Sequence, residues 1–227
     1  MGGIERVVFW DFDGTLAFRD GHWSSTLASA LALVRPELAL SAEDFRDDIS
    51  VGFPWHAPDV IRITESAAAW WAAQRPLFLR AYTAAGVSHD AANAAISRIP
   101  KEYYRPTAWT LAYDAITALR TTADAGYQNV VLSNHAPELP GLVSDLGLGA
   151  WIATTVTSAA VGAEKPDARI FQYAIALTNA GEDVWMIGDN LTADIAGAEA
   201  VGIHAIHIGN DCTLLRAAER IADGAPH

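Results

Sequence analysis

Short apolar runs alternate with longer amphipathic stretches over most of the chain. The first apolar run covers 7–10, and the alternation continues from about residue 107 onward. Runs of this length are typical of strands buried on both faces of a parallel sheet. The pattern predicts strands at 7–10, 130–132, 152–156, 184–187 and 203–206, with helices at 111–125, 140–146, 166–177 and 194–200. We therefore expect an α/β fold, a Rossmann-like three-layer core with helices on both faces of a parallel sheet.

No strand pattern stands out between residues 17 and 105. The Ala-rich stretch from Thr64 to Ala85 contains Pro76, which is expected to divide it into two helices. Ser88 to Ile99 predicts another helix. These residues therefore predict an all-helical insertion over 17–105, with the sheet built from 1–16 and 106–227.

Composition excludes several kinds of protein. Of the 227 residues, 51% are apolar and 19% are charged, so the chain is not expected to be disordered. The 27 acidic residues outnumber the 15 basic ones, and the net charge is -12. Nucleic acids and anionic membrane surfaces are therefore disfavoured as partners. An anionic substrate would have to be bound by local groups. The oligomeric state is not indicated.

Cysteine use and hydropathy favour a cytoplasmic protein. A single cysteine, Cys212, excludes an intramolecular disulfide and favours a reducing compartment, although a secreted protein without disulfides stays open. The apolar run at 7–10 is too short for a secretion signal. The uncharged stretch 146–163 contains glycines and hydroxyl residues, so it predicts a loop and a strand, not a membrane span.

Polar residues follow the predicted strands. Asp11 to Thr15 come after the first strand, Ser133-Asn134 after the second, and Gly188 to Asp194 after the fourth, while Lys165 precedes a predicted helix. Ligands of open α/β sheets bind outside the carboxyl ends of the strands. Three aspartates, a serine and a lysine are therefore expected to converge at one edge of the sheet.

Such a set of side chains suits phosphoryl transfer. Carboxylate oxygens are the ligands that Mg²⁺ prefers, and Mg²⁺ usually takes only one or two of them from a protein. An aspartate that keeps an oxygen available can attack phosphorus. A carboxyl group two residues away can protonate the leaving oxygen and then accept a proton from water. Lys165 and Ser133 could neutralise the phosphoryl oxygens.

The sequences Asp11-Phe12-Asp13-Gly14-Thr15, Ser133-Asn134, Lys165-Pro166 and Gly188-Asp189 through Asp194 resemble, in order, the four motifs of the haloacid dehalogenase (HAD) superfamily. The resemblance spans residues 7 to about 206. The helical insertion lies where that family places its first type of cap, which would close over the core and choose the leaving group.

The resemblance implies a role for each matching residue. Asp11 would be the nucleophile and Asp13 the general acid and base, with Lys165 offsetting the charge of Asp11. The implied Mg²⁺ ligands are Asp11, Asp13 (through its backbone carbonyl) and Asp189, supported by Asn190 and Asp194. The implied phosphate-binding residues are Thr15, Ser133, Asn134 and Lys165. Further candidates for substrate contact are His22, Trp55 and His56.

The second aspartate narrows the reaction. Haloacid dehalogenases lack it because a halide leaves without a proton, so Asp13 favours phosphate esters. We therefore expect a Mg²⁺-dependent phosphatase that acts on a small phosphorylated metabolite through an aspartyl-phosphate. A phosphomutase of the same fold and a non-enzymatic aspartyl-phosphate acceptor stay open as alternatives.

Overall fold

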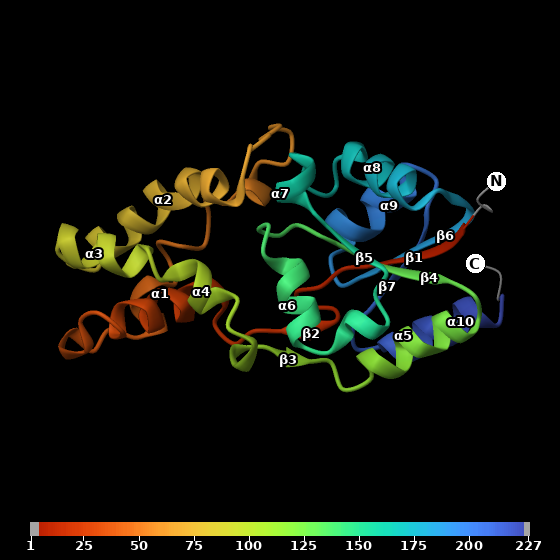
Figure 1. Cartoon of the computed structure of the whole chain (residues 1–227), viewed down its shortest axis with the longest axis horizontal. Coiled ribbons are helices and arrows are strands. Elements are labelled where there is room, and N and C mark those ends of the chain that lie inside the picture. The colour runs from red at the N-terminus through yellow and green to blue at the C-terminus, as the bar shows by residue number, and fades with distance from the viewer. Residues whose placement is uncertain (1–4, 225–227) are drawn as a thin grey trace. The chain divides into compact units, whose positions relative to one another are not determined.

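The computed structural model describes residues 5–224 and contains a five-stranded sheet in which neighbouring strands run parallel (Figure 1). The strands, in spatial order, are β5 (Thr154–Thr157), β4 (Gln128–Ser133), β1 (Glu5–Trp10), β6 (Ala180–Gly188) and β7 (His204–His207). The predicted parallel sheet is thus confirmed. Strand β1 is central, so the loop that follows it lies between the loops that follow β4 and β6.

Helices cover both faces of this sheet. Val7 and Phe9 of β1 pack in one apolar cluster with residues of α8 (Ala168–Thr178) and α9 (Gly197–Glu199). Side chains alternate along a strand, so Val8 and Trp10 point to the opposite face. The helices α5 (Ala115–Asp124) and α10 (Leu214–Ala222) lie side by side on that opposite face (Figure 1). The three-layer arrangement follows from this alternation.

Smaller elements complete the sheet-bearing part of the chain. They are the helices α6 (Leu139–Asp145) and α7 (Ser158–Val161) and an antiparallel pair of short strands, β2 (Ala17–Phe18) and β3 (Thr110–Leu111). The β2–β3 pair was not predicted. It corrects the expected helix at 111–125, because residues 110 and 111 pair with β2 and the helix begins only at Ala115.

The helix expected at 194–200 is also corrected. A π-helical segment, Leu191–Ala196, begins earlier and continues into α9. The side chain of Asn190 accepts hydrogen bonds from the backbone N–H groups of Thr192 and Ala193, at 3.0 and 2.9 Å. An asparagine in this position caps a helix, so the turn begins directly after it.

The chain divides into two compact units. The first contains the sheet and comprises residues up to 18, 58–63 and from 110 onward; the second comprises Arg19–Ala57 and Thr64–Trp109. Within the second unit, all of it described, the regular elements are helices: α1 (His22–Ala32), α2 (Ala67–Ala84), α3 (His89–Ile96), α4 (Ile99–Tyr103) and several 3₁₀ turns. Residues 58–63 group with the sheet, although the sequence placed them within the insertion.

Pro76 does not divide the second unit's longest helix, so that prediction was wrong. Helix α2 runs from Ala67 to Ala84 with Pro76 inside it. Proline removes the hydrogen bond to the carbonyl four residues earlier. Both Ala72 and Pro76 are exposed, so water can solvate that carbonyl group. Among the residues described, no helix combines the length and the apolar character needed to cross a lipid bilayer.

A buried amide ties the sheet to α5. The side chain of Asn129, on β4, is 1% exposed. Its Oδ1 accepts from Trp10 Nε1 at 2.9 Å and from Thr122 Oγ1 at 2.7 Å, and its Nδ2 donates to the carbonyl oxygen of Leu119 at 2.8 Å. A buried donor or acceptor that loses its partner is destabilising. This one side chain therefore holds β1, β4 and α5 in register.

Replacement of that amide is expected to destabilise the fold in a graded way. Asn129→Ala removes three hydrogen bonds, leaves the buried Nε1 of Trp10 without its partner and opens a cavity, so it should lower the free energy of unfolding by about 2–4 kcal/mol. Thr122→Val removes one hydrogen bond at similar volume and should lower it by about 1 kcal/mol. Urea unfolding followed by circular dichroism measures both. Equal values for the two variants would contradict the role given to Asn129.

Candidate active site

Asp11 occupies the first position after the central strand. It extends the β1–β6 pairing by one hydrogen bond, from its N–H to the carbonyl oxygen of Ile187 at 2.9 Å. The loop then turns at Gly14, which has a φ of +89°. A Cβ on Gly14 would lie 2.5 Å from Asp189 Oδ2, so only glycine lets this loop approach Asp189 so closely.

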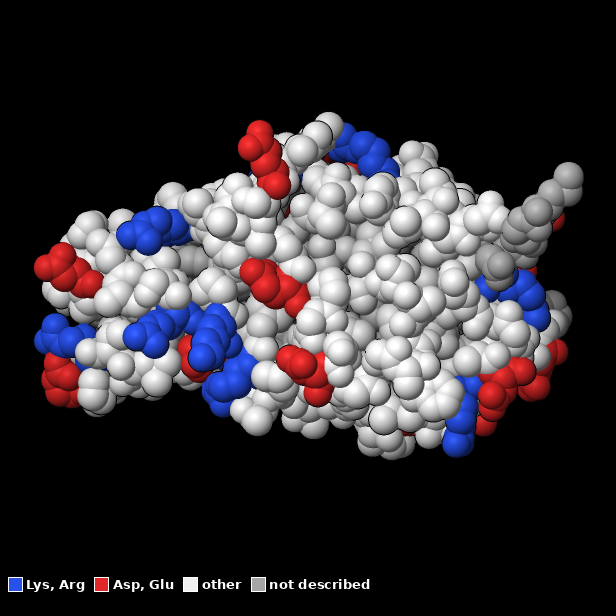
Figure 2. Space-filling view, viewed as in Figure 1, with Lys and Arg blue, Asp and Glu red and all other residues white. Residues whose placement is uncertain are grey.

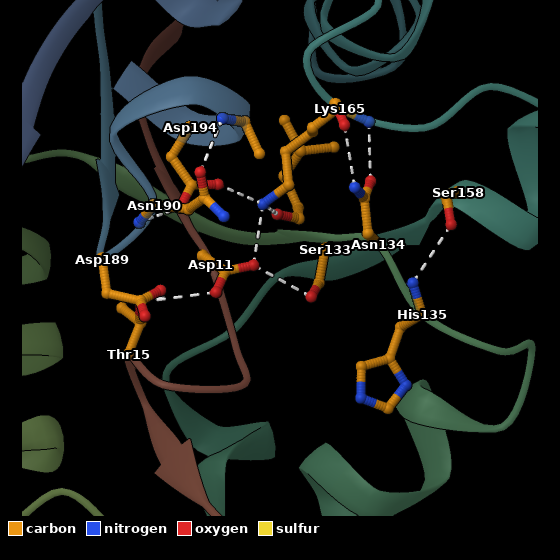
Figure 3. Close-up of polar contacts among 12 residues, drawn as sticks. Asp11, Thr15, Ser133, Asn134, His135, Ser158, Lys165, Asp189, Asn190 and Asp194 are labelled. Atoms are coloured by element: carbon orange, nitrogen blue, oxygen red, sulfur yellow. Dashed lines mark hydrogen bonds and ion pairs between the residues drawn. The ribbon is translucent and has the colours of Figure 1, made fainter. Parts of the chain in front are cut away.

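Two donors hold one oxygen of Asp11 (Figure 3). Lys165 Nζ donates to Asp11 Oδ1 at 2.7 Å, and Ser133 Oγ donates to the same oxygen at 3.0 Å. Thr15 Oγ1 lies 3.4 Å from Asp11 Oδ2 and 3.4 Å from Asp189 Oδ1. The carboxylate of Asp11 is thus fixed through Oδ1, while Oδ2 lies on the side of Asp189.

Lys165 is the buried cation of the site, with a side chain only 2% exposed. Besides Asp11, its Nζ donates to the carbonyl oxygen of Leu132 at 2.8 Å and to Asp194 Oδ1 at 2.5 Å. These contacts use all three donors of an ammonium group. Burial opposes the charged form, but the carboxylates of Asp11 and Asp194 outweigh it and raise the pKa of Lys165. The lysine is therefore charged.

Asn134 positions the backbone of Lys165. Its Nδ2 donates to the carbonyl oxygen of Lys165 at 2.9 Å, and its Oδ1 accepts from the Lys165 N–H at 2.6 Å. This pair of hydrogen bonds joins the loop after β4 to the loop before α8 (Figure 3). Its side-chain amide is committed to that contact, so the phosphate-binding role expected for Asn134 would have to use its backbone N–H.

Three carboxylates gather close to one another beside Lys165. Asp11, Asp189 and Asp194 each offer an oxygen within 4.8 Å of the others. Burial raises the pKa of Asp194 to about 6 against the opposing charge of Lys165. Desolvation and the negative charge of Asp11 raise the pKa of Asp189, although this side chain keeps contact with solvent. Such a set of hard oxygen donors, whose mutual repulsion a divalent cation would relieve, fits Mg²⁺.

The supporting residues expected from the sequence lie at this edge of the sheet. Asp194 Oδ2 accepts from the backbone N–H of Asn190 at 3.0 Å, which holds the loop after β6. Asn190 itself is exposed and caps the π-helical segment. Asp13 is half-buried on the loop after β1.

His135 and Glu164 are buried near these residues and were not chosen from the sequence. The imidazole of His135 lies edge-on to Phe12, with ring centroids 5.8 Å apart. Burial lowers the pKa of His135 to about 4, against the charges of Asp13 and Asp11, so the ring is neutral at neutral pH. Glu164 directly precedes Lys165, which is the one lysine of the sheet-bearing unit. That position in the sequence is the signal that could have identified Glu164 as a candidate.

The candidates in the insertion belong to the second unit. His22 is exposed at the start of α1. Trp55 stacks on Phe53 with ring centroids 4.6 Å apart, and His56 Nδ1 accepts from the backbone N–H of Phe53 at 3.2 Å. The turn Pro54–His56 is thereby ordered within its own unit. A contact of these three residues with substrate stays a prediction.

The chain is similar to several known proteins. Human haloacid dehalogenase-like hydrolase domain-containing protein 3 is 34% identical over 138 residues, which are 60% of this chain and 54% of that protein. A phosphoserine phosphatase from Thermus thermophilus is 29% identical over 147 residues, 63% of this chain and 58% of that protein. The matches thus span little more than half the length of these relatives.

Solved structures share the fold. A 2-haloacid dehalogenase from Pseudomonas syringae has a TM-score of 0.67 at 20% identity, over 98% of this chain and all (100%) of that one. A HAD phosphatase from Thermococcus onnurineus has a TM-score of 0.61 at 19% identity, over 96% of each chain. At these identities the likeness concerns the fold alone.

A family description agrees with the motifs found in the sequence. The model of the haloacid dehalogenase-like hydrolases matches residues 5–202, most of the chain, including the four motif segments. The chain therefore belongs to the haloacid dehalogenase-like hydrolases.

Proposed function

We propose that the chain is a Mg²⁺-dependent phosphatase that hydrolyses a small phosphate monoester through an aspartyl-phosphate on Asp11. The observation that carries this proposal is the carboxylate of Asp11, which Lys165 and Ser133 hold through Oδ1 at 2.7 and 3.0 Å. A nucleophile fixed through one oxygen keeps the other for attack. Asp13 follows two residues later on the same loop, and we assign to it the protonation of the leaving group.

The residues divide the reaction into two halves. In the first, Asp11 Oδ2 forms a bond to phosphorus, the bond from phosphorus to the ester oxygen breaks, and Asp13 gives its proton to the departing alcohol. In the second, Asp13 takes a proton from water, the water oxygen bonds to phosphorus, and the bond to Asp11 breaks. The positive charge of Lys165, held beside Asp11 by its three hydrogen bonds, offsets the negative charge that develops on the phosphoryl oxygens. Ser133 can rotate its hydroxyl from Asp11 to a phosphoryl oxygen.

Mg²⁺ is the cofactor that the donor set fits. The carboxylates of Asp11 and Asp189 and the backbone carbonyl of Asp13 would hold it, with Asp194 and Asn190 supporting them. When bound, the ion supplies positive charge that neutralises the phosphoryl oxygens. The 4.8 Å cluster of three carboxylates supports this assignment.

The substrate class follows from Asp13 and from charge. A halide needs no proton as it leaves, whereas an alkoxide does, so a second carboxyl group favours an ester over a haloacid. The phosphoserine phosphatase relative supports this choice. On the face drawn in Figure 2, charged side chains of the described residues are scattered over a larger uncharged area. With a net charge of -12, the protein would bind an anionic metabolite only through local groups such as Lys165. We propose the cytoplasm as its location.

Removal of the nucleophile tests the reaction class. Asp11→Asn is expected to lower phosphate release by about a thousandfold or more, because an amide does not attack phosphorus. The assay follows hydrolysis of an aryl phosphate and a panel of alkyl phosphates with Mg²⁺. Asp20→Asn, an exposed neighbour, is the control and should keep full activity. Activity of Asp11→Asn at the wild-type level would exclude Asp11 as the nucleophile.

The two roles of Asp13 predict a dependence on the leaving group. Asp13→Asn should slow alkyl ester hydrolysis by about 10²–10⁴-fold, because an alkoxide needs the proton. A nitrophenolate leaves without one, so with an aryl phosphate this variant should still form the phosphoenzyme. Rapid mixing should then show a burst of nitrophenolate followed by slow release of phosphate. An equal loss of the first step with both esters would argue against Asp13 as the acid.

Metal dependence is expected at the level of binding as well as of turnover. A chelator should abolish hydrolysis, and added Mg²⁺ should restore it. Titration calorimetry should detect Mg²⁺ binding to the wild type and a large loss of affinity in Asp189→Asn, since the variant removes one charged oxygen ligand. Unchanged affinity in that variant would place the ion elsewhere.

Two outcomes of the activity assays would identify the alternative functions. A stable phosphoenzyme would identify a phosphoacceptor, and transfer of the phosphoryl group to a second hydroxyl would identify a mutase.

A further inference from the structure

Segment 58–63 of the insertion packs directly on the loop that leads to Lys165. The N–H of Arg62 donates to the carbonyl oxygen of Gly162 at 2.9 Å. Gly162 has a φ of +81°, and a Cβ there would lie 3.0 Å from Ile63 Cγ1 and 3.2 Å from Ile63 Cα. Both features favour glycine. The backbone of this short segment therefore meets the backbone of the catalytic loop without an intervening side chain.

Glu164 lies between that contact and Lys165. Its side chain is 4% exposed, and its Oε2 has no hydrogen-bond partner within the described part of the chain. Burial raises the pKa of Glu164 to about 6, against a hydrogen bond from Ser158 and the charges of Arg62 and Lys165. Because this pKa is raised, the fold loses stability as the pH rises through about 6. A buried carboxyl group with one oxygen that lacks a hydrogen-bond partner points to a role other than packing.

Ser158 connects Glu164 to the second phosphate-binding loop. Ser158, whose hydroxyl favours the ionised form of Glu164, accepts through Oγ from the backbone N–H of His135 at 3.1 Å (Figure 3). His135 lies two residues after Ser133. Glu164 is thus joined to Lys165 by a peptide bond, and Ser158, which acts on Glu164, is hydrogen-bonded to the loop of Ser133.

We propose that Arg62 and Glu164 form a clasp that ties segment 58–63 to the two phosphate-binding loops, and that Glu164 is thereby a positioning residue for Lys165 and Ser133. The charge of Arg62 stabilises the ionised Glu164, and Glu164 in turn orders Ser158. This inference rests on the proposed function, because it assigns the clasp to the binding of phosphoryl oxygens.

Substitutions within the clasp should weaken phosphate binding more than they slow the chemical step. Glu164→Gln keeps the size of the side chain and an acceptor for Ser158 but removes the charge that faces Arg62; Arg62→Ala removes the partner. Each should raise KM for an aryl phosphate and the inhibition constant of inorganic phosphate about tenfold, as expected when binding groups shift by a fraction of an ångström. The fall in kcat should be smaller.

Matched variants separate the clasp from general damage. Arg62→Lys keeps the charge and should restore most of the phosphate affinity, and Asp59→Asn, an exposed carboxylate of the same segment, should leave it unchanged. The double variant Arg62→Ala with Glu164→Gln should bind phosphate no more weakly than the more impaired of the two single variants, because both substitutions remove the same interaction. Additive losses, or a loss as large in Asp59→Asn, would overturn the proposal.

A readout without turnover keeps the clasp and the proposed function distinguishable. Hydrogen–deuterium exchange of peptides covering 58–63 and 162–165 should accelerate in Glu164→Gln and Arg62→Ala and stay unchanged in Asp59→Asn. If the wild type hydrolyses no ester, the proposed function fails, while this exchange pattern still supports the clasp. Unaltered exchange in both clasp variants would overturn it.

Discussion

The active-site edge of the sheet depends on one buried ammonium group. Lys165 Nζ lies between the carboxylates of Asp11 and Asp194, at 2.7 and 2.5 Å, and also donates to the end of β4. Without a cation, two buried carboxylates this close would repel each other and lose their hydration. With it, the loops after β1, β4 and β6 and the loop before α8 can meet at one point. The same contact sets the orientation of Asp11 and leaves its second oxygen outside the contact with Lys165, as the proposed attack on phosphorus requires.

The central position of β1 explains why the candidate site can be assembled from few residues. Because β4 and β6 flank β1, the residues that follow these three strands are neighbours without any long side chain having to reach across the sheet. Ser133 and Asp189 therefore lie on either side of Asp11. Lys165 is the exception, since its loop comes from beyond β5, and the structure compensates with Asn134, whose amide holds the backbone of that loop.

The sequence was a good guide where one physical signal dominated. Buried parallel strands are short apolar runs, and polar residues at their carboxyl ends were visible as the motif segments, so the sheet and the convergence of these residues at its edge were predictable. Pro76 misled because its local cost is small on a solvated helix face. The early start at Leu191 depended on the cap formed by Asn190. The assignment of segment 58–63 to the sheet-bearing unit depends on a backbone contact with Gly162, which no periodicity reveals.

Buried polar groups divide this molecule into two kinds. Asn129 is buried, its side chain forms hydrogen bonds with Trp10, Thr122 and Leu119, and its role is to stabilise the fold. Asp194 and Glu164 are buried carboxyl groups whose pKa burial raises to about 6, so the charged form of each is less favourable in the folded protein than in water. Both contact or adjoin Lys165. Carboxyl groups with raised pKa values are common at functional sites, and this agrees with the roles proposed for Asp194 and Glu164 beside Lys165.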